Sequence, residues 1–158
     1  MIQATARVLR NVIEMELEGE SWVAKPVVTS TGTISRAIAA LFSTVYETYR
    51  SSEPNVVHST VSYSAKKDEI LIQIGESKWR TRSSMFGPLT FEYGGTNYEI
   101  HEKLTGRFAI FRDGGLVANG QLGFRSCEVR EYPAELQGFL GNLALGYLIR
   151  NLFWEMLR

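Results

Sequence analysis

Three basic side chains at alternate positions are the feature of the sequence most suited to binding chemistry. Lys78, Arg80 and Arg82 lie two residues apart. On a β-strand such residues share one face, with roughly 7 Å between successive members. This row suits phosphate groups, because arginine binds an oxyanion through two hydrogen bonds and lysine adds a point charge. Lys66 and Lys67, in a nearby predicted turn, would extend the row. The pattern predicts a site for an anion or a lipid headgroup.

The basic row has a second interpretation, as one half of a charged face exposed to solvent. Glu14, Glu16 and Glu18 form an acidic row with the same spacing. If the two strands are neighbours, each pair of opposite charges contributes about 0.2–1 kcal/mol. Such pairing would leave no free basic group for a ligand. The sequence leaves both interpretations open, and in either of them Trp79 points away from the row and into the core.

Residues capable of catalysis are few and scattered. His58 and His101 fall in predicted strands, with no carboxylate or cysteine at the spacing of a metal site. Asp68 and Asp113 occupy predicted turns, and Cys127 fits a small strand residue better than a nucleophile. The sequence contains no glycine-rich phosphate loop and no HExxH or GxSxG pattern. We therefore expect a protein that is not an enzyme and that uses no cofactor and no metal.

Charge and composition restrict the partners. The chain has 158 residues, with 17 lysines and arginines against 17 aspartates and glutamates, so its net charge is zero. Proteins that hold nucleic acid through its phosphates carry a positive excess, so we expect no nucleic-acid partner. One cysteine allows no internal disulfide, and no secretory signal is recognisable, so we expect a cytoplasmic location, with or without peripheral membrane contact. No linker divides the chain, and we expect one domain over residues 1–158.

Period-two alternation predicts a fold rich in antiparallel strands. Strands are expected on both sides of a turn at residues 19–21, and then one after another from residue 56 to 129. The last of them is expected to run unbroken over 116–129. Asp-Gly and Gly-Gly pairs between the runs favour hairpins, so the series predicts a meander that closes toward a barrel. Aromatic residues of these strands, including Phe111 and Phe124, are expected to pack in the core and between hairpins.

Two helices are also predicted. Ile34, Ile38 and Leu41 recur at helical spacing and predict an amphipathic helix near residues 33–50. The second helix begins near Pro133 and continues to the end of the chain.

The C-terminal helix is unusual because its residues 136–149 carry no charge and place apolar groups in every direction. Such a helix must be enclosed by protein or by lipid. This run would be about 21 Å long, shorter than a bilayer core, so enclosure by the predicted sheet is favoured. Gly138, Gly141 and Ala144 leave a thin strip along which strand backbones could approach.

The hairpin series FEYGG (residues 91–95) and FAIFRDGGLVA (residues 108–118), followed by the apolar helix, resembles the tubby C-terminal-like superfamily. This superfamily includes the phospholipid scramblases and the LURP-one-related proteins. The resemblance covers roughly residues 59–158 and implies an α+β fold, with a barrel-like antiparallel sheet wrapped around the hydrophobic C-terminal helix. It also implies a non-catalytic binding domain for a lipid headgroup, a membrane surface or a protein partner. Tubby-type proteins bind phosphoinositide headgroups through a Lys-x-Arg pair, whose spacing Lys78 and Arg80 share.

Two alternatives remain open at this point. The order of the predicted elements is similar to the START and pollen-allergen helix-grip fold, which implies a carrier with an apolar ligand in a cavity between sheet and helix. The other alternative is a tail-anchored membrane protein that uses the apolar segment at residues 136–149.

Overall fold

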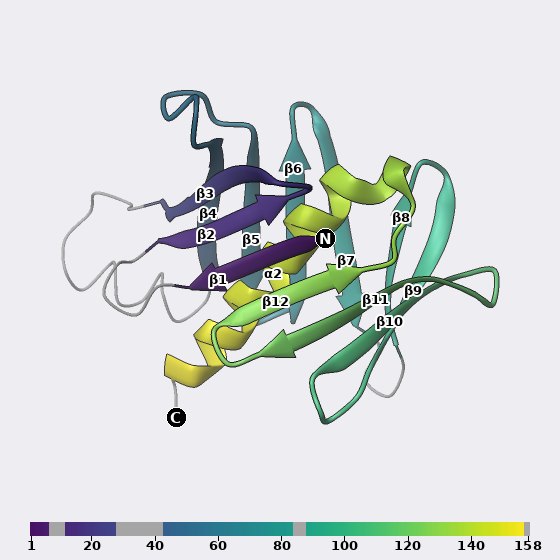
Figure 1. Ribbon diagram of the computed structural model, residues 1–158. Helices are drawn as coiled ribbons and strands as arrows, with labels where there is room; N and C mark the ends of the chain where they lie inside the picture. Colours follow the sequence, from purple (N-terminus) through teal and green to yellow (C-terminus); the bar gives the residue numbers. More distant parts are fainter. Residues whose placement is uncertain (7–11, 28–42, 84–87, 157–158) are drawn as a thin grey trace.

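The alternating segments of the chain pair into a closed barrel in the computed structural model (Figure 1). The structure describes residues 1–6, 12–27, 43–83 and 88–156. Over these residues the strands are β1 (Ile2–Ala6), β2 (Ile13–Leu17), β3 (Glu20–Pro26), β4 (Ser43–Arg50), β5 (Ser59–Ser64), β6 (Glu69–Ile74), β7 (Ser77–Ser83), β8 (Leu89–Tyr93), β9 (Thr96–Glu102), β10 (Arg107–Arg112), β11 (Gly115–Gly123) and β12 (Ser126–Arg130). The chain continues through a short 3₁₀ helix, η1 (Ala134–Leu136), into the long helix α2 (Gln137–Met156).

The barrel is a meander in which each strand pairs antiparallel with the next, and β1 closes the ring by pairing with β12. Alternation determines which side chains face inward. In β2, for example, Ile13, Met15 and Leu17 are buried, whereas Glu14 and Glu16 are exposed. Closure leaves no long free edge for another chain to extend. The predicted fold class, a barrel-like sheet around a C-terminal helix, is confirmed.

Helix α2 fills the inside of the barrel (Figure 1). It packs against β1, β2, β5, β6 and β12. Every residue from 136 to 149 is buried except Gln137, Gly138 and Asn142. Enclosure by the sheet, as predicted, therefore accounts for the missing polar face. Within the described residues, no helix combines the length and apolarity required to cross a bilayer.

The glycines of α2 do not act as predicted. A Cβ on Gly138 would meet no atom within 4 Å, so this residue does not require glycine. A Cβ on Gly141 would lie 2.6 Å from Leu17 Cδ2, and one on Gly146 would lie 2.5 Å from Ile70 Cγ2. The missing side chains of Gly141 and Gly146 thus make room for side chains of the sheet, not for its backbone.

The predicted helix near residues 33–50 is wrong in its described part. Residues 43–50 form β4, which pairs with β3 and β5, while the rest of that prediction lies outside the described residues. The segment STVYETYR is rich in β-branched and aromatic residues, which fit a pleated surface, and its Tyr46 and Thr48 are buried at alternate positions. The unbroken strand expected over 116–129 also divides, at a turn where Arg125 has a φ of 56°.

Aromatic rings connect α2 with the sheet. Phe139 in the first turn of α2 lies 4.8 Å from Phe91 and from Tyr93, between ring centroids, and 5.7 Å from Trp79. Farther along α2, the ring of Tyr147 stacks on Phe108 at 5.1 Å. These contacts fill the part of the barrel interior that faces β7, β8 and β10.

One polar group in this interior makes no hydrogen bond of normal geometry. The hydroxyl of Tyr147 is buried, with the carboxylate of Glu102 as its nearby polar neighbour within the described residues, and burial, reinforced by Glu102, holds its pKa well above the usual value. An unsatisfied buried hydroxyl costs about 1–3 kcal/mol. We therefore expect Tyr147→Phe to raise the free energy of unfolding by about 1 kcal/mol in urea denaturation.

The matched control for this prediction is Tyr63→Phe. The Tyr63 hydroxyl donates to Asp68 Oδ1 at 2.6 Å and accepts from Trp154 Nε1 at 3.0 Å. Its loss is expected to destabilise by about 1–2 kcal/mol. Equal losses in the two variants would contradict the assignment of Tyr147 as unsatisfied.

Candidate functional site

The basic row lies on the outside of the barrel. Lys78 and Arg80 are exposed on the outer face of β7, and Trp79 between them turns inward, 5.3 Å from Tyr93 between ring centroids. The backbone of Arg82 lies in β7 opposite Glu69, and its side chain is outside the described residues. The predicted direction of Lys78, Arg80 and Trp79 is thus confirmed.

The acidic row cannot neutralise the basic row, because β3, β4, β5 and β6 lie between β2 and β7. The alternative in which the two strands are neighbours is therefore wrong. Glu18 also leaves its row, since it lies in the β2–β3 turn with a φ of 50° and accepts a hydrogen bond from Tyr132. The ionic partner of Arg80 is Glu69, with 3.8 Å between Nε and Oε1. The Arg80 side chain is itself 47% exposed, so it stays accessible to a ligand, although its partner Glu69 is mostly buried.

The five predicted residues do not converge on one point. Lys66 and Lys67 lie in the turn between β5 and β6, next to the end of β7 that holds Arg82. Lys78 lies four residues away at the other end of β7, a separation of roughly 13 Å along a strand. A hollow of about 620 Å³ beside Lys78 and Arg80 also contains Glu92, which offsets part of their charge. The structure therefore separates a turn site from a strand site.

The turn site belongs to one end of the barrel, which we call the C-terminal rim. It comprises the turns at residues 65–68, 103–106 and 124–125 and the last turn of α2 (Figure 1). These turns share an end because they follow β5, β9 and β11, which run in the same direction through the meander. The ion pair between Arg150 Nη2 and Glu102 Oε1, at 2.8 Å, fixes α2 to the same end.

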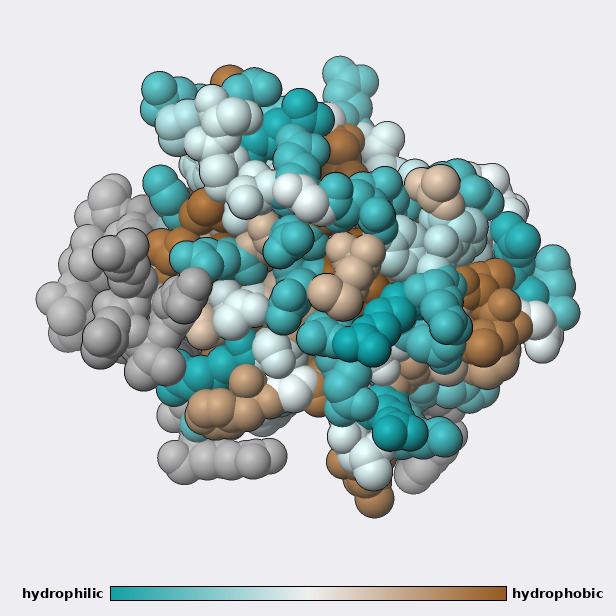
Figure 2. All heavy atoms as spheres, in the orientation of Figure 1, coloured by the Kyte–Doolittle hydropathy of each residue, from teal (hydrophilic) through white to brown (hydrophobic). Residues whose placement is uncertain are grey.

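The C-terminal rim exposes large apolar side chains. Leu104 at the tip of the β9–β10 turn is fully exposed, and Phe124 and Trp154 are 77% and 45% exposed. The expectation that Phe124 packs in the core and between hairpins is wrong, because the chain turns at Phe124 and Arg125 and leaves that ring exposed. Figure 2 shows hydrophobic atoms at the lower tip of the molecule, where Figure 1 places the β9–β10 turn.

Basic groups surround these apolar tips. The exposed side chains of Lys66, Lys67, Lys103 and Arg107 form no ion pair within the described part of the chain, and Arg125 lies over the Phe124 ring at 5.3 Å. Carboxylates of the same rim are already engaged: Asp68 with Tyr63, Glu102 with Arg150, and Glu155 with Asn151.

The opposite end of the barrel is rich in carboxylates. They are Glu18, Glu20, Glu53, Glu76, Asp113, Glu131 and Glu135. Three of these carboxylates are paired there, Glu18 with the N-terminal amine and Glu20 and Glu53 with Arg50, so the charge of this end is partly balanced.

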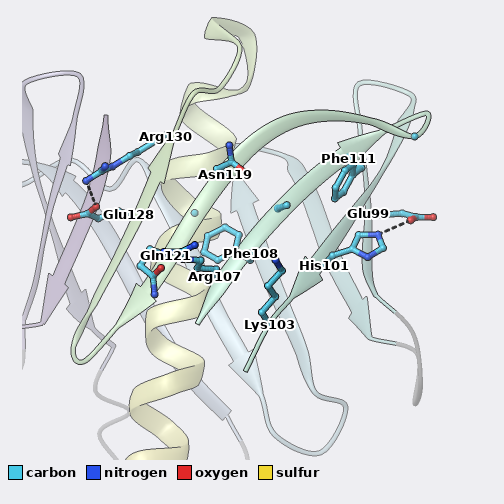
Figure 3. Close-up of a pocket in the computed structure, with 13 residues that line it drawn as sticks. Glu99, His101, Lys103, Arg107, Phe108, Phe111, Asn119, Gln121, Glu128 and Arg130 are labelled. Carbon is cyan, nitrogen blue, oxygen red and sulfur yellow. Dashed lines mark hydrogen bonds and ion pairs between the residues drawn. The ribbon is translucent and has the colours of Figure 1, made fainter. Parts of the chain in front are cut away.

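A second candidate site is a groove on the outer face of β9–β12 (Figure 3). The strand registers place Arg107 beside Gln121 and Glu128, and Ala109 beside His101, Asn119 and Arg130. Ala109 has the smallest side chain of this group and lies at its centre. The larger side chains around it therefore enclose a hollow of about 830 Å³.

The charges of the groove are only partly balanced. Arg130 Nη2 lies 2.9 Å from Glu128 Oε2, and His101 Nε2 lies 3.1 Å from Glu99 Oε2 (Figure 3). Lys103 and Arg107 have no carboxylate partner within the described residues. The groove therefore keeps a positive charge on the side nearest the C-terminal rim.

Sequence reasoning missed the groove because its residues come from four strands whose register the sequence does not give. Phe111, expected in the core, is half-buried on the outer face with its ring 5.0 Å from that of His101. The only available signal was the small Ala109 between outward-facing Arg107 and Phe111, which occurs in many strands.

Two groups considered for chemistry lie away from these surfaces. Cys127 is buried in β12, and burial raises the pKa of its thiol to about 12, so it stays protonated at neutral pH. The ring of His58 lies 5.0 Å from that of Trp22. Within the described ranges, no three histidine, cysteine or acidic side chains gather as a metal site.

Comparison with known proteins identified no relative of this chain. A scan against family models and searches of curated proteins and of solved structures found no match. The function is therefore argued from the chemistry of the rim and of the groove.

Proposed function

We propose that the protein is a non-catalytic binding domain of the tubby-like type that engages an anionic membrane surface through its C-terminal rim. One observation carries this proposal: the exposed apolar tips Leu104 and Phe124 lie at the same end as Lys66 and Lys67, which are exposed and form no ion pair within the described residues. A closed barrel around an apolar terminal helix also supports the resemblance on which the tubby-like assignment rests.

The two kinds of side chain supply the two contributions that peripheral binding needs. Each Lys or Arg near an anionic leaflet contributes about 1 kcal/mol, and this falls off within a Debye length. Complete burial of a leucine or phenylalanine contributes about 1.5–3 kcal/mol. Neither contribution alone gives stable attachment, but together they do.

The predicted basic residues divide between two roles in this proposal. Lys66 and Lys67 contact the membrane surface. Lys78 and Arg80, on the wall of the barrel, form a separate site for a headgroup or an anionic partner, and they contribute little to docking of the rim.

The test is cosedimentation with vesicles of phosphatidylcholine and phosphatidylserine at low salt. Leu104→Ser with Phe124→Ser is expected to lower the partition coefficient about tenfold or more, because two apolar groups no longer enter the interface. Lys66→Gln with Lys67→Gln is expected to lower it about thirtyfold, by loss of roughly 2 kcal/mol, and to weaken its salt dependence.

Two matched controls come from the opposite end of the barrel. Leu116 is 55% exposed there, and Leu116→Ser should leave the partition coefficient unchanged. Lys78→Gln should lower it less than twofold. Equal binding by the rim variants and the native protein would overturn the proposal. A loss confined to Lys78→Gln would instead assign membrane contact to the strand row.

A further inference from the structure

The shape of the groove on the outer face of β9–β12 follows from the register of these strands. Ala109 on β10 lies opposite His101 of β9 and Asn119 of β11. Ala109 lines the hollow, and the larger side chains of His101, Asn119 and Arg107 stand around it (Figure 3). The volume of about 830 Å³ lies within the range of small-molecule sites.

The charges of the groove select for one anionic group. Lys103 and Arg107 lie on the side nearest the C-terminal rim and have no carboxylate partner within the described residues. Glu128 lies in the same cross-strand row as Arg107, on the far side of Gln121, and is held by Arg130, whereas Glu99 lies farther along the strands and is held by His101. A ligand with anionic groups at both ends would meet these carboxylates. A single anionic group beside Arg107 satisfies the uncompensated charge without that repulsion.

The remaining surface of the groove suits a flat apolar body. Phe111 stands on the outer face with its ring 5.0 Å from that of His101, at an interplanar angle of 81°. Together with Ala109 these rings form an apolar corner that lies two to four residues along β10 from Arg107, roughly 7–13 Å away. An aromatic ring placed over Ala109 would contact Phe111 on one side and direct a substituent toward Arg107.

We propose that this groove binds a small aromatic monoanion, of the aryl carboxylate class, with its ring over Ala109 and its carboxylate on Arg107 and Lys103. Arginine pairs with a carboxylate through two parallel hydrogen bonds, which fixes the orientation of the ring. The site shares Lys103 and Arg107 with the C-terminal rim, but it includes neither the apolar tips Leu104 and Phe124 nor Lys66 and Lys67, so the two proposals are tested with different variants.

The experiment is a titration of the ¹⁵N-labelled protein with 2-naphthoate, followed by amide chemical shifts. The amides of His101, Ala109 and Asn119 are expected to shift, and that of Lys78 on the far wall is expected to stay unchanged. The neutral analogue 2-naphthamide has the same shape and should bind about tenfold more weakly, because it lacks the charge-assisted hydrogen bonds.

Two variants separate shape from charge. Ala109→Leu fills the floor of the hollow from an outward-facing position and is expected to weaken both compounds about tenfold or more. Arg107→Gln should weaken 2-naphthoate about tenfold and leave 2-naphthamide unchanged. Arg112→Gln, on the same strand but outside the groove, is the matched control and should change neither.

Two results would overturn the proposal: equal affinity for 2-naphthoate and 2-naphthamide, or undiminished binding by Arg107→Gln. The second measurement does not depend on whether Ala109→Leu folds. Failure of the vesicle experiment would leave these outcomes unaffected, because Leu104, Phe124, Lys66 and Lys67 stay native throughout the titrations.

Discussion

Phe139→Ala is expected to lower the free energy of unfolding by about 3–5 kcal/mol, the usual cost of truncating a buried phenylalanine. The Phe139 side chain is only 1% exposed, and its ring contacts Phe91, Tyr93 and Trp79. No neighbouring group can refill the space, because a closed barrel surrounds the helix and restricts relaxation. The expected loss is a large part of the stability of a domain of this size.

Phe139→Ala is expected to do more than leave a cavity, because Phe139 also helps to close the barrel. Within the described residues, β7 and β8 pair only at Arg82 with Thr90 and at Ser83 with Leu89. Beyond these pairs, Trp79 on β7 and Tyr93 on β8 still touch, at 5.3 Å between ring centroids, and Phe139 packs on both. Side chains therefore close the barrel where the ladder is short. Truncation at Phe139 should also expose Trp79 and shift its fluorescence to longer wavelength.

Urea denaturation followed by tryptophan fluorescence measures this effect, and Phe124→Ala is the matched control. The same substitution at a ring that is 77% exposed should change stability by less than about 0.5 kcal/mol. A loss below 1 kcal/mol at Phe139, or equal losses at the two positions, would contradict the role given to the aromatic contacts between α2 and β7–β8.

The elements that sequence reasoning predicted are those in which local pattern and tertiary environment agree. A strand of the barrel has one wet face and one face against α2, so β2 shows the plain alternation of buried Ile13 and Met15 with exposed Glu14. Helix α2 is surrounded, so its residues 136–149 show no polar face. In both cases the hydropathy pattern of the segment reflects how many of its sides contact the rest of the protein.

The predicted helix failed at β4 because two periodicities coexist there. Val45 and Tyr49 continue the helical spacing set by Ile38 and Leu41, but Tyr46 and Thr48 also alternate as strand residues. Pairing with β3 and β5 decides between the two, and that pairing involves partners remote in sequence.

The candidate sites could likewise be predicted only in part, because they too depend on partners remote in sequence. The spacing of Lys78 and Arg80 predicts a shared face correctly, but not that β2 lies too far away to neutralise it. Nothing in the order of residues indicates that Lys66 and Leu104 share one end of the barrel. That conclusion requires the direction of every strand between them.

Alanine substitutions at two glycines of α2 are expected to change the free energy of unfolding in opposite directions. Gly146→Ala is expected to lower the free energy of unfolding by about 1–3 kcal/mol, because its Cβ would lie 2.5 Å from Ile70 Cγ2. Ile70 is 1% exposed and Val61 beside it is fully buried, so neither can yield without disturbing β5 and β6. Gly146→Val, which adds two further methyl groups, should cost about 3 kcal/mol.

The same alanine substitution at Gly138 is expected to raise the free energy of unfolding by about 0.5–1 kcal/mol, since a Cβ there meets no atom within 4 Å. Alanine favours the helix over glycine equally at both positions, so the difference between Gly146→Ala and Gly138→Ala isolates the contact with Ile70. Urea denaturation of the two variants measures that difference. A stabilising Gly146→Ala would mean that β5 and β6 can move away from α2, and that the barrel does not hold its helix as closely as the contacts of Gly146 imply.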